Sequence, residues 1–310
     1  MGEHTVHILR RRYRRASRLR RQRFGVVAVV GTLLALLVFF ALFGVFLTQY
    51  VPLWMTENES AFTAQTQTSM ANLKANMDSQ AAFNGPPIYA TPFTLSSQGV
   101  PLIAQPTAAT LNFVPQVPGV FANVSMTVGP GGSGPYYQNF SLGTLALTLP
   151  DRYYSPQFFQ LENDAVIQGQ ADTQEIVAFP PLLNVSWVGT NASITMALTQ
   201  LYGNATQAVS SGVQNVYSHL LFTSTQVSNG GGSAFGARLL MGTHYPCAWA
   251  TFLNKTLVSS QLPASHWTLS TKTCQASGGL TRDLTLTFLN INQFRLIVSG
   301  FAIVLGVGVE

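Results

Sequence analysis

The hydrophobic pattern divides the chain into parts of different character. Val26 to Leu47 is an uncharged apolar run of 22 residues, long enough as a helix to cross the roughly 30 Å hydrocarbon layer of a bilayer. From Thr56 to Phe83 there is no Gly or Pro, and apolar residues recur at three- and four-residue spacing. After Ile88, short apolar and β-branched runs alternate with clusters of Gly, Pro, Asn and Ser. The pattern therefore predicts a transmembrane helix, an amphipathic helix and a β-rich domain.

The positions at which the pattern changes divide the chain into four segments. We expect a basic leader over residues 1–25, a transmembrane helix over 26–47, an amphipathic stalk helix over 48–85 and a β-rich external domain over 86–310. The fold class expected is mainly β and sandwich-like, preceded by a long N-terminal helix, because regular short strands with turn signals are typical of sandwiches and barrels.

The amphipathic helix carries its own start signals. Thr56 and Glu59 have the spacing of a capping box, which predicts that this helix begins at Thr56. Pro52 predicts a kink or break just before it. We expect the apolar stripe to pack on the β-rich domain, and a partner helix is the alternative. The stripe comprises Phe62, Ser69, Met70, Leu73, Met77 and Ala81.

The β-rich part predicts strands at intervals of roughly ten residues. No amphipathic helix is predicted after Phe83. The final apolar segment, Leu296 to Val309, is short for a membrane span and rich in β-branched residues, so a buried strand is expected and a second membrane helix is the alternative. The predicted strands are Thr110–Val114, Val120–Val128, Thr144–Leu149, Asp164–Gln168, Ile176–Phe179, Asn184–Val188, Ser193–Gln200, Val216–Thr223 and Thr281–Ile291.

Charge orients the chain. Nine arginines lie between Arg10 and Arg23, directly before the apolar run, and such residues collect on the cytoplasmic side. We therefore expect a single pass, with the N-terminus cytoplasmic and the rest extracellular. After the anchor, seven Lys and Arg stand against ten Asp and Glu, so this part is mildly acidic and nucleic acid is excluded as a partner. The basic tail predicts contact with membrane lipids.

Two features agree with an external location. The two cysteines, Cys247 and Cys274, predict one disulfide, with free thiols or a metal site as alternatives. Seven Asn-X-Ser/Thr sequons make the chain a candidate glycoprotein. These glycosylation candidates are Asn58, Asn123, Asn139, Asn184, Asn191, Asn204 and Asn254.

Candidate chemistry is sparse. Glu162 with Asp164, or Asp172 with Glu175, has the form of an acid–base pair, although solvated loop carboxylates are the commoner case. An extracellular hydrolase would need one of three external histidines beside a carboxylate and a nucleophile. The Gly-rich stretches 129–135 and 228–233 lack phosphate-binding contexts and predict long hairpin turns. We expect that the chain is not an enzyme and binds no cofactor or metal. The three external histidines that a hydrolase site could use are His219, His244 and His266.

Two resemblances to known groups of proteins indicate where in the cell the chain is located. Arg21 to Gly25, followed by an apolar and an amphipathic helix, resembles type IV pilin-like proteins, which implies leader cleavage between Gly25 and Val26. The stretches Tyr50–Met55 and Phe159–Ile167 resemble uncharacterised archaeal surface proteins with a Tyr-x-x-Glu-x-Gly-Ala-Val type motif, in which Asp164 here replaces the glycine. That resemblance implies a β-sandwich head at the archaeal cell surface and no particular reaction.

Together these points predict a membrane-anchored cell-surface protein with a structural or adhesive role. It acts either as a pilin-like subunit that self-assembles or as a fixed anchor beside other surface proteins. A membrane-tethered module that binds a sugar or solute is the alternative, and it would need a concave pocket lined by aromatic side chains.

Overall fold

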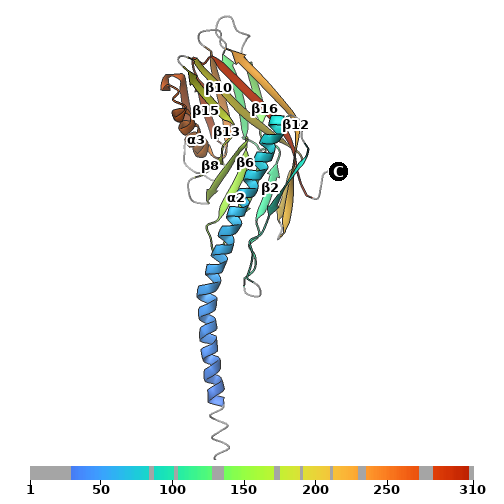
Figure 1. The fold of residues 1–310 in the computed structure, drawn as a ribbon, viewed down its shortest axis with the longest axis vertical. Coiled ribbons are helices and arrows are strands. Elements are labelled where there is room, and N and C mark those ends of the chain that lie inside the picture. The colour runs from blue at the N-terminus through green and yellow to red at the C-terminus, as the bar shows by residue number, and fades with distance from the viewer. Residues whose placement is uncertain are drawn as a thin grey trace, which may run out of the picture. The chain divides into compact units, whose positions relative to one another are not determined.

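The computed structural model describes residues 29–83, 87–100, 104–127, 136–170, 175–188, 191–209, 212–229, 235–271 and 282–306. The chain forms two compact units, Met1–Trp54 and Met55–Glu310. The first unit is helical where it is described, and the second, the head, is mostly β (Figure 1). The predicted fold class, a long N-terminal helix followed by a mainly β domain, is confirmed.

The N-terminal helix is continuous. Residues 29–45 are α-helical, η1 (Phe46–Tyr50) is a π-helical turn, and α2 (Val51–Phe83) follows directly. Pro52 has no N–H to donate four residues back, and the wider turn ends just before α2, so the helix passes the proline without a break. The predicted helix start at Thr56 is therefore wrong, because Thr56 lies inside α2.

The described part of the head contains three sheets. The first has the order β1-β12-β16-β10-β9, the second β11-β2-β5-β6-β7-β8 and the third β14-β15-β13-β3-β4. Neighbours are antiparallel except for β10 and β16, which run parallel. The strands are β1 (Tyr89–Thr94), β2 (Thr110–Val114), β3 (Phe121–Thr127), β4 (Tyr136–Ser141), β5 (Thr144–Leu149), β6 (Gln157–Glu162), β7 (Ala165–Gln170), β8 (Ile176–Phe179), β9 (Leu183–Val188), β10 (Asn191–Tyr202), β11 (Thr206–Val209), β12 (Val213–Asn229), β13 (Gly236–Thr243), β14 (Trp267–Thr271), β15 (Arg282–Phe288) and β16 (Gln293–Leu305).

Two hydrophobic cores hold these sheets together. The first sheet contributes to both, because β10 and β16 are long enough to cross from one to the other. At one end Met196 and Leu296 pack in a core with Leu239 and Leu286 of the third sheet. At the other end Leu201 and Phe301 pack in a core with side chains of the second sheet and of α2. The head is thus sandwich-like at both ends, and a helix packs in each core, α3 (Pro246–Ser259) in the first and α2 in the second.

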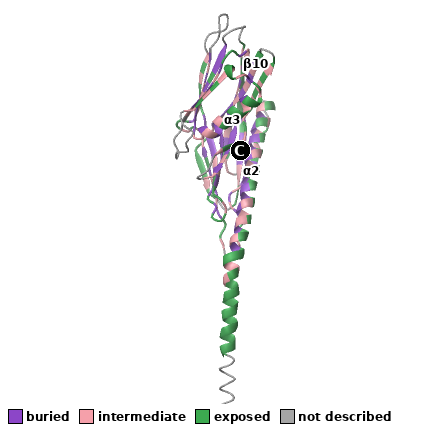
Figure 2. Cartoon of the chain, turned by 90° about the vertical axis from the view of Figure 1, so that its left-hand side faces the viewer, coloured by how far each residue is buried: buried purple, intermediate pink, exposed green. Residues whose placement is uncertain are grey.

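The helix α2 buries the apolar stripe that the sequence predicts. Phe62, Met70, Leu73 and Met77 are at most 3% exposed and pack with strands of the first and second sheets. Ser69 and Ala81 are only partly buried. Figure 2 shows the change along the helix, which is largely exposed in its early part and buried along one side within the head. Within one chain, the stripe packs on the head and not on a partner helix.

One sequence expectation about the later chain is wrong. A second α-helix, α3 (Pro246–Ser259), follows β13, and its Trp249, Leu253 and Leu257 are buried at four-residue spacing. Pro246 stands in its first turn, where a missing N–H costs nothing. Of the Gly-rich stretch 228–233, residues 230–233 lie outside the described residues, and the strands before and after it, β12 and β13, belong to different sheets. The stretch 129–135 lies outside the described residues, between the antiparallel neighbours β3 and β4.

The C-terminal apolar segment forms a strand as far as the structure describes it. Residues from Gln293 to Leu305 make up β16, which lies between β10 and β12 in the first sheet. Buried and partly exposed side chains mix along it, as in a strand that packs on a core with one face. A membrane helix over this segment is therefore excluded up to Leu305.

Candidate functional site

A long exposed apolar surface lies on the N-terminal helix. The helix Val29–Phe83 contains a window long and apolar enough to cross a membrane, and none of that window is buried. Leu37 is 68% exposed and Leu42 67% exposed, for example. Surface helices of soluble proteins carry one apolar stripe, whereas this window is apolar on every side. It can therefore span a membrane. Of the predicted limits, Leu47 lies in η1, while Val26 and the cleavage pair Gly25–Val26 lie outside the described residues.

Glu59 is the main polar contact between α2 and the head. Its side chain is fully buried, and its carboxylate accepts hydrogen bonds from three successive backbone N–H groups, those of Arg152, Tyr153 and Tyr154, at 2.7–3.2 Å. The Thr107 hydroxyl donates a fourth bond at 2.8 Å. Successive N–H groups that point inwards form an anion-binding concavity. Glu59 is thus no helix cap, and its carboxylate instead closes a loop 93 residues away.

Two neighbouring carboxyl groups of this site, Glu59 and Asp151, have pKa values shifted in opposite directions. Burial alone would raise the pKa of Glu59, but the N–H donors and the Thr107 hydroxyl outweigh it and hold this pKa below its ordinary value. Asp151 lies next to it and accepts a hydrogen bond from the Thr63 hydroxyl at 3.4 Å. Burial and the nearby Glu59 charge raise the pKa of Asp151 to about 6. At neutral pH both groups are ionised. Ionisation of Asp151 costs free energy, because this carboxylate is partly buried and lies near the Glu59 charge.

Lys74 forms the second polar contact between α2 and the sheets. Its ammonium lies 2.8 Å from Asp78 one turn later and 3.2 Å from Asp164 in the β6–β7 hairpin. The Lys74 and Asp164 side chains are only 8% and 6% exposed, whereas Asp78 is about half exposed. Burial raises the pKa of Asp164, and the Lys74 charge opposes the rise. A charged pair buried to this extent is uncommon, since desolvation offsets much of its attraction.

The hairpin that carries Asp164 is a two-residue turn. Asn163 and Asp164 both have positive φ, 48° and 64°, as the type I′ turn between antiparallel strands requires. Asn and Asp adopt this conformation more readily than other non-Gly residues. Glycine would be favoured at position 164, and the aspartate found there keeps the turn while placing a carboxylate beside α2.

A row of side-chain hydrogen bonds continues along α2. The helix runs antiparallel to β1, so that later helix residues meet earlier strand residues. The hydrogen-bonded pairs, helix residue first, are Gln65 with Thr94 (2.8 Å), Ser69 with Pro92 (3.0 Å), Asn76 with Thr91 (3.0 Å) and Gln80 with Pro87 (3.0 Å). The fully buried Gln80 side chain also donates a hydrogen bond to the Ser218 carbonyl of β12 at 2.8 Å.

The predicted acid pair Glu162 and Asp164 does not form a shared site. Glu162 is fully buried, accepts a hydrogen bond from Gln160 at 3.2 Å, and lies near Thr243 and Trp249, whereas Asp164 faces Lys74. Burial raises the pKa of Glu162 to about 7. Both carboxyls are therefore buried groups with separate partners, and their expectation as solvated loop residues is wrong. Of the other pair, Asp172 lies outside the described residues.

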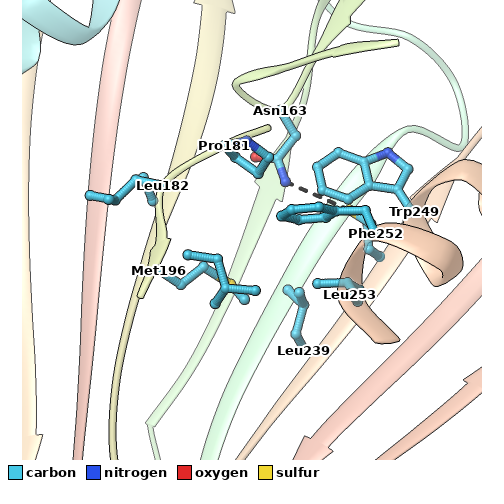
Figure 3. Close-up of a pocket in the computed structure, with 11 residues that line it drawn as sticks. Asn163, Pro181, Leu182, Met196, Leu239, Trp249, Phe252 and Leu253 are labelled. Carbon is cyan, nitrogen blue, oxygen red and sulfur yellow. Dashed lines mark hydrogen bonds between the residues drawn. The ribbon is translucent and has the colours of Figure 1, made fainter. Parts of the chain in front are cut away.

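A small recess lies on the far side of the hairpin turn. It measures about 280 Å³, including space open to solvent, and is lined by Trp249, Phe252 and Leu253 of α3 with Met196, Leu239 and their neighbours (Figure 3). Asn163 contributes the one polar side chain among its lining residues, and its amide donates to the Met241 sulfur at 3.6 Å. Sugar sites need several polar groups with fixed orientation, and this recess does not provide them.

The remaining candidate residues stay apart or lie on the surface. His219 is exposed on β12, His244 is partly buried between β13 and α3, and His266 packs on Trp187. Burial lowers the pKa of His244. Within the described ranges, no group of three or more His, Cys, Asp or Glu side chains could hold a metal ion. Cys247 lies in α3, and Cys274 lies outside the described residues together with the disulfide predicted for the pair.

The sequons differ in exposure. Asn58 and Asn123 are only partly exposed, and the Asn58 amide donates to the Gln98 carbonyl at 3.0 Å. The other five are exposed: Asn139, Asn184, Asn191, Asn204 and Asn254. Strand positions such as Asn139 and Asn184 therefore point to solvent, as attachment of a glycan requires.

The residues that sequence reasoning missed are the buried polar ones of α2. Thr63, Thr66, Lys74 and Gln80 lie on the same face as the apolar stripe. The available signal was the position of Thr66, Lys74 and Gln80, each three or four residues from Phe62, Met70 or Met77.

No family model matches the chain, and neither the curated proteins nor the solved structures contain a match to it.

Proposed function

We propose that this chain is a single-pass, membrane-anchored cell-surface protein whose head has a structural or adhesive role. The observation that carries the proposal is one continuous helix with two environments. Its first part is apolar on every side and unburied, and its second part is bound into the head through Glu59, Lys74 and Gln80. A helix of this kind can connect a membrane to a folded head.

The arginine-rich leader supports the orientation. Nine arginines before the apolar run place the N-terminus in the cytoplasm by the positive-inside rule. The head then lies outside the cell, where exposed sequons such as Asn204 and Asn254 can be glycosylated. The partners of this arrangement are membrane lipids around the apolar helix and other surface proteins, or further copies of this chain, around the head.

A pilin-like subunit and a fixed anchor differ at the leader. In the first case a peptidase cuts between Gly25 and Val26, and the apolar helix leaves the bilayer for a filament core. In the second case the leader stays. N-terminal sequencing of the protein from native membranes separates the two, because a start at Val26 supports the pilin-like subunit and an intact leader supports the fixed anchor.

Membrane anchoring itself is tested by alkaline extraction of membranes. We expect the wild-type chain to stay in the pellet. Leu37→Arg should shift part of it to the soluble fraction, because an arginine at the centre of a membrane helix costs about 3 kcal/mol. Phe83→Arg is the matched control, since Phe83 is an exposed apolar residue at the other end of the same helix. Wild-type protein in the soluble fraction would contradict the proposal.

A further inference from the structure

Lys74 is more deeply buried than the lysine of an ordinary surface salt bridge, and it contacts two carboxyl groups. Its Nζ atom lies 3.2 Å from an Asp164 carboxyl oxygen, and both side chains are more than nine-tenths buried. Asp78 holds the same Nζ through both of its oxygens, at 2.8 and 3.0 Å. One amine is therefore in contact with two carboxyls, of which one is buried and one is half exposed.

Apolar side chains cover the buried side of this group. Leu73 and Met77, which flank Lys74 on α2, are at most 1% exposed, and so is Val166, next to the turn in β7. The two-residue turn with positive φ at Asn163 and Asp164 leaves the Asp164 backbone little freedom. The amine nitrogen and a carboxyl oxygen of Asp164 are thus held within hydrogen-bond distance, which keeps the two reacting groups side by side.

The same burial favours the protonated form of Asp164. Separated charges are costly in a low-dielectric interior, and burial raises the pKa of Asp164. Transfer of one proton from the Lys74 ammonium to Asp164 produces a neutral amine beside a neutral carboxylic acid. Asp78 contacts the same Nζ and interacts with the Asp164 carboxyl. A neutral amine is a nucleophile, and a neutral carboxylic acid can lose its hydroxyl as water.

We infer that Lys74 and Asp164 join in an intramolecular amide bond, with Asp78 as the group that moves the protons. The Nζ lone pair attacks Cγ of Asp164 and forms a tetrahedral intermediate. Asp78 accepts a proton from Nζ and returns it to the departing hydroxyl, so that one C–N bond forms, one C–O bond breaks and one water molecule leaves. The ionised pair and the products balance without any oxidant or co-reactant.

The bond would tie α2 covalently to the β6–β7 hairpin. The two joined residues are 90 positions apart in the chain, so the cross-link closes a large loop and restrains the unfolded state. It also prevents α2 from being pulled out of the head under tension. The inference does not depend on which side of the membrane the head occupies.

The test is a digest of the denatured full-length protein with a glutamate-specific protease, followed by mass spectrometry. Cleavage after Glu162 and Glu175 releases residues 163–175, which include Asp164, whereas Lys74 falls in residues 60–162. We expect the free 163–175 peptide to be absent and a branched product to appear, lighter by one water than the sum of its two parts. A free 163–175 peptide at full yield, with no branched product, would overturn the inference.

Variants assign the roles of the three residues. Lys74→Arg keeps the charge but cannot form this amide, so it should restore the free peptide completely, and Asp164→Ala should leave residues 60–162 unbranched. Asp78→Asn should slow the reaction and leave a mixture that converts with time. Lys255→Arg, at an exposed position on α3, is the matched control and should stay fully cross-linked. The wild-type digest decides the question even if a variant does not fold.

Discussion

Replacement of Glu59 by alanine provides a quantitative test of how α2 is held in the head. The substitution removes a fully buried carboxylate and leaves the N–H groups of Arg152, Tyr153 and Tyr154 and the Thr107 hydroxyl without their acceptor. A hydrogen bond to a charged group contributes about 1.5–3 kcal/mol. Because four such bonds share one carboxylate and water can enter the space, their contributions are not additive. Removal of one partner from a buried charged contact typically costs about 3–5 kcal/mol.

We therefore expect Glu59→Ala to lower the free energy of unfolding by about 4 kcal/mol, the middle of that range. For a domain of this size, this corresponds to a fall in melting temperature of roughly 8–16 °C. The assay is urea unfolding of the full-length protein in detergent, followed by the fluorescence of the head tryptophans Trp187, Trp249 and Trp267. Glu57→Ala is the matched control, since Glu57 is exposed on the same helix.

The stability that Glu59 contributes should also depend on pH, which the same unfolding assay can measure. The pKa of Glu59 is lowered by folding, so its contribution to stability is present above the ordinary value of 4.5 and is lost as the pH falls through the folded-state value. The difference between wild type and Glu59→Gln should therefore shrink on acidification. A loss of stability no larger than about 0.5 kcal/mol for Glu59→Ala, the range of an ordinary surface substitution, would refute the reasoning.

Three further predictions follow from buried or exposed groups of the head. Folding raises the pKa of Asp151 to about 6 and that of Glu162 to about 7, so the folded head binds more protons than the unfolded chain. Its stability should fall as the pH rises from about 5 to 8, and less steeply in Asp151→Asn, as urea titrations at several pH values will show. Gly242→Ala should destabilise the head by about 2–4 kcal/mol, because a Cβ there would lie 2.2 Å from the Gly119 carbonyl oxygen, and thermal unfolding measures this directly. Peptide mapping should find glycans at the exposed sequons before the partly buried Asn58 and Asn123; the exposed ones are Asn139, Asn184, Asn191, Asn204 and Asn254.

The sequence predicts the local structure of the head well where one physical signal dominates. Strands such as Thr110–Val114 and Thr144–Leu149 have the predicted limits, because alternating side chains and flanking turn residues agree there. The buried stripe of α2 is also readable, since helical periodicity requires only one element. The strand at the C-terminus follows from its β-branched residues and its length.

What the sequence did not predict depends on contacts between distant positions. Thr56 and Glu59 have the spacing of a capping box, yet Glu59 binds N–H groups that lie more than 90 residues later. Lys74 and Glu162 belong to charged types that are usually exposed, and only tertiary packing explains their burial. The helix α3 was missed because its apolar positions stand among β-branched residues, in a part of the chain that otherwise reads as strands.

The central claim is that one apolar helix anchors the chain with the head outside the cell. Lysine positions offer a direct test, because the leader holds arginines only and every lysine lies after the anchor. Lys255 is exposed on α3. The measurement is labelling of intact cells with a membrane-impermeant amine reagent, followed by mass spectrometry of the Lys255 peptide. We expect Lys255 to be labelled in intact cells to the same extent as after lysis, and labelling only after lysis would contradict the claim.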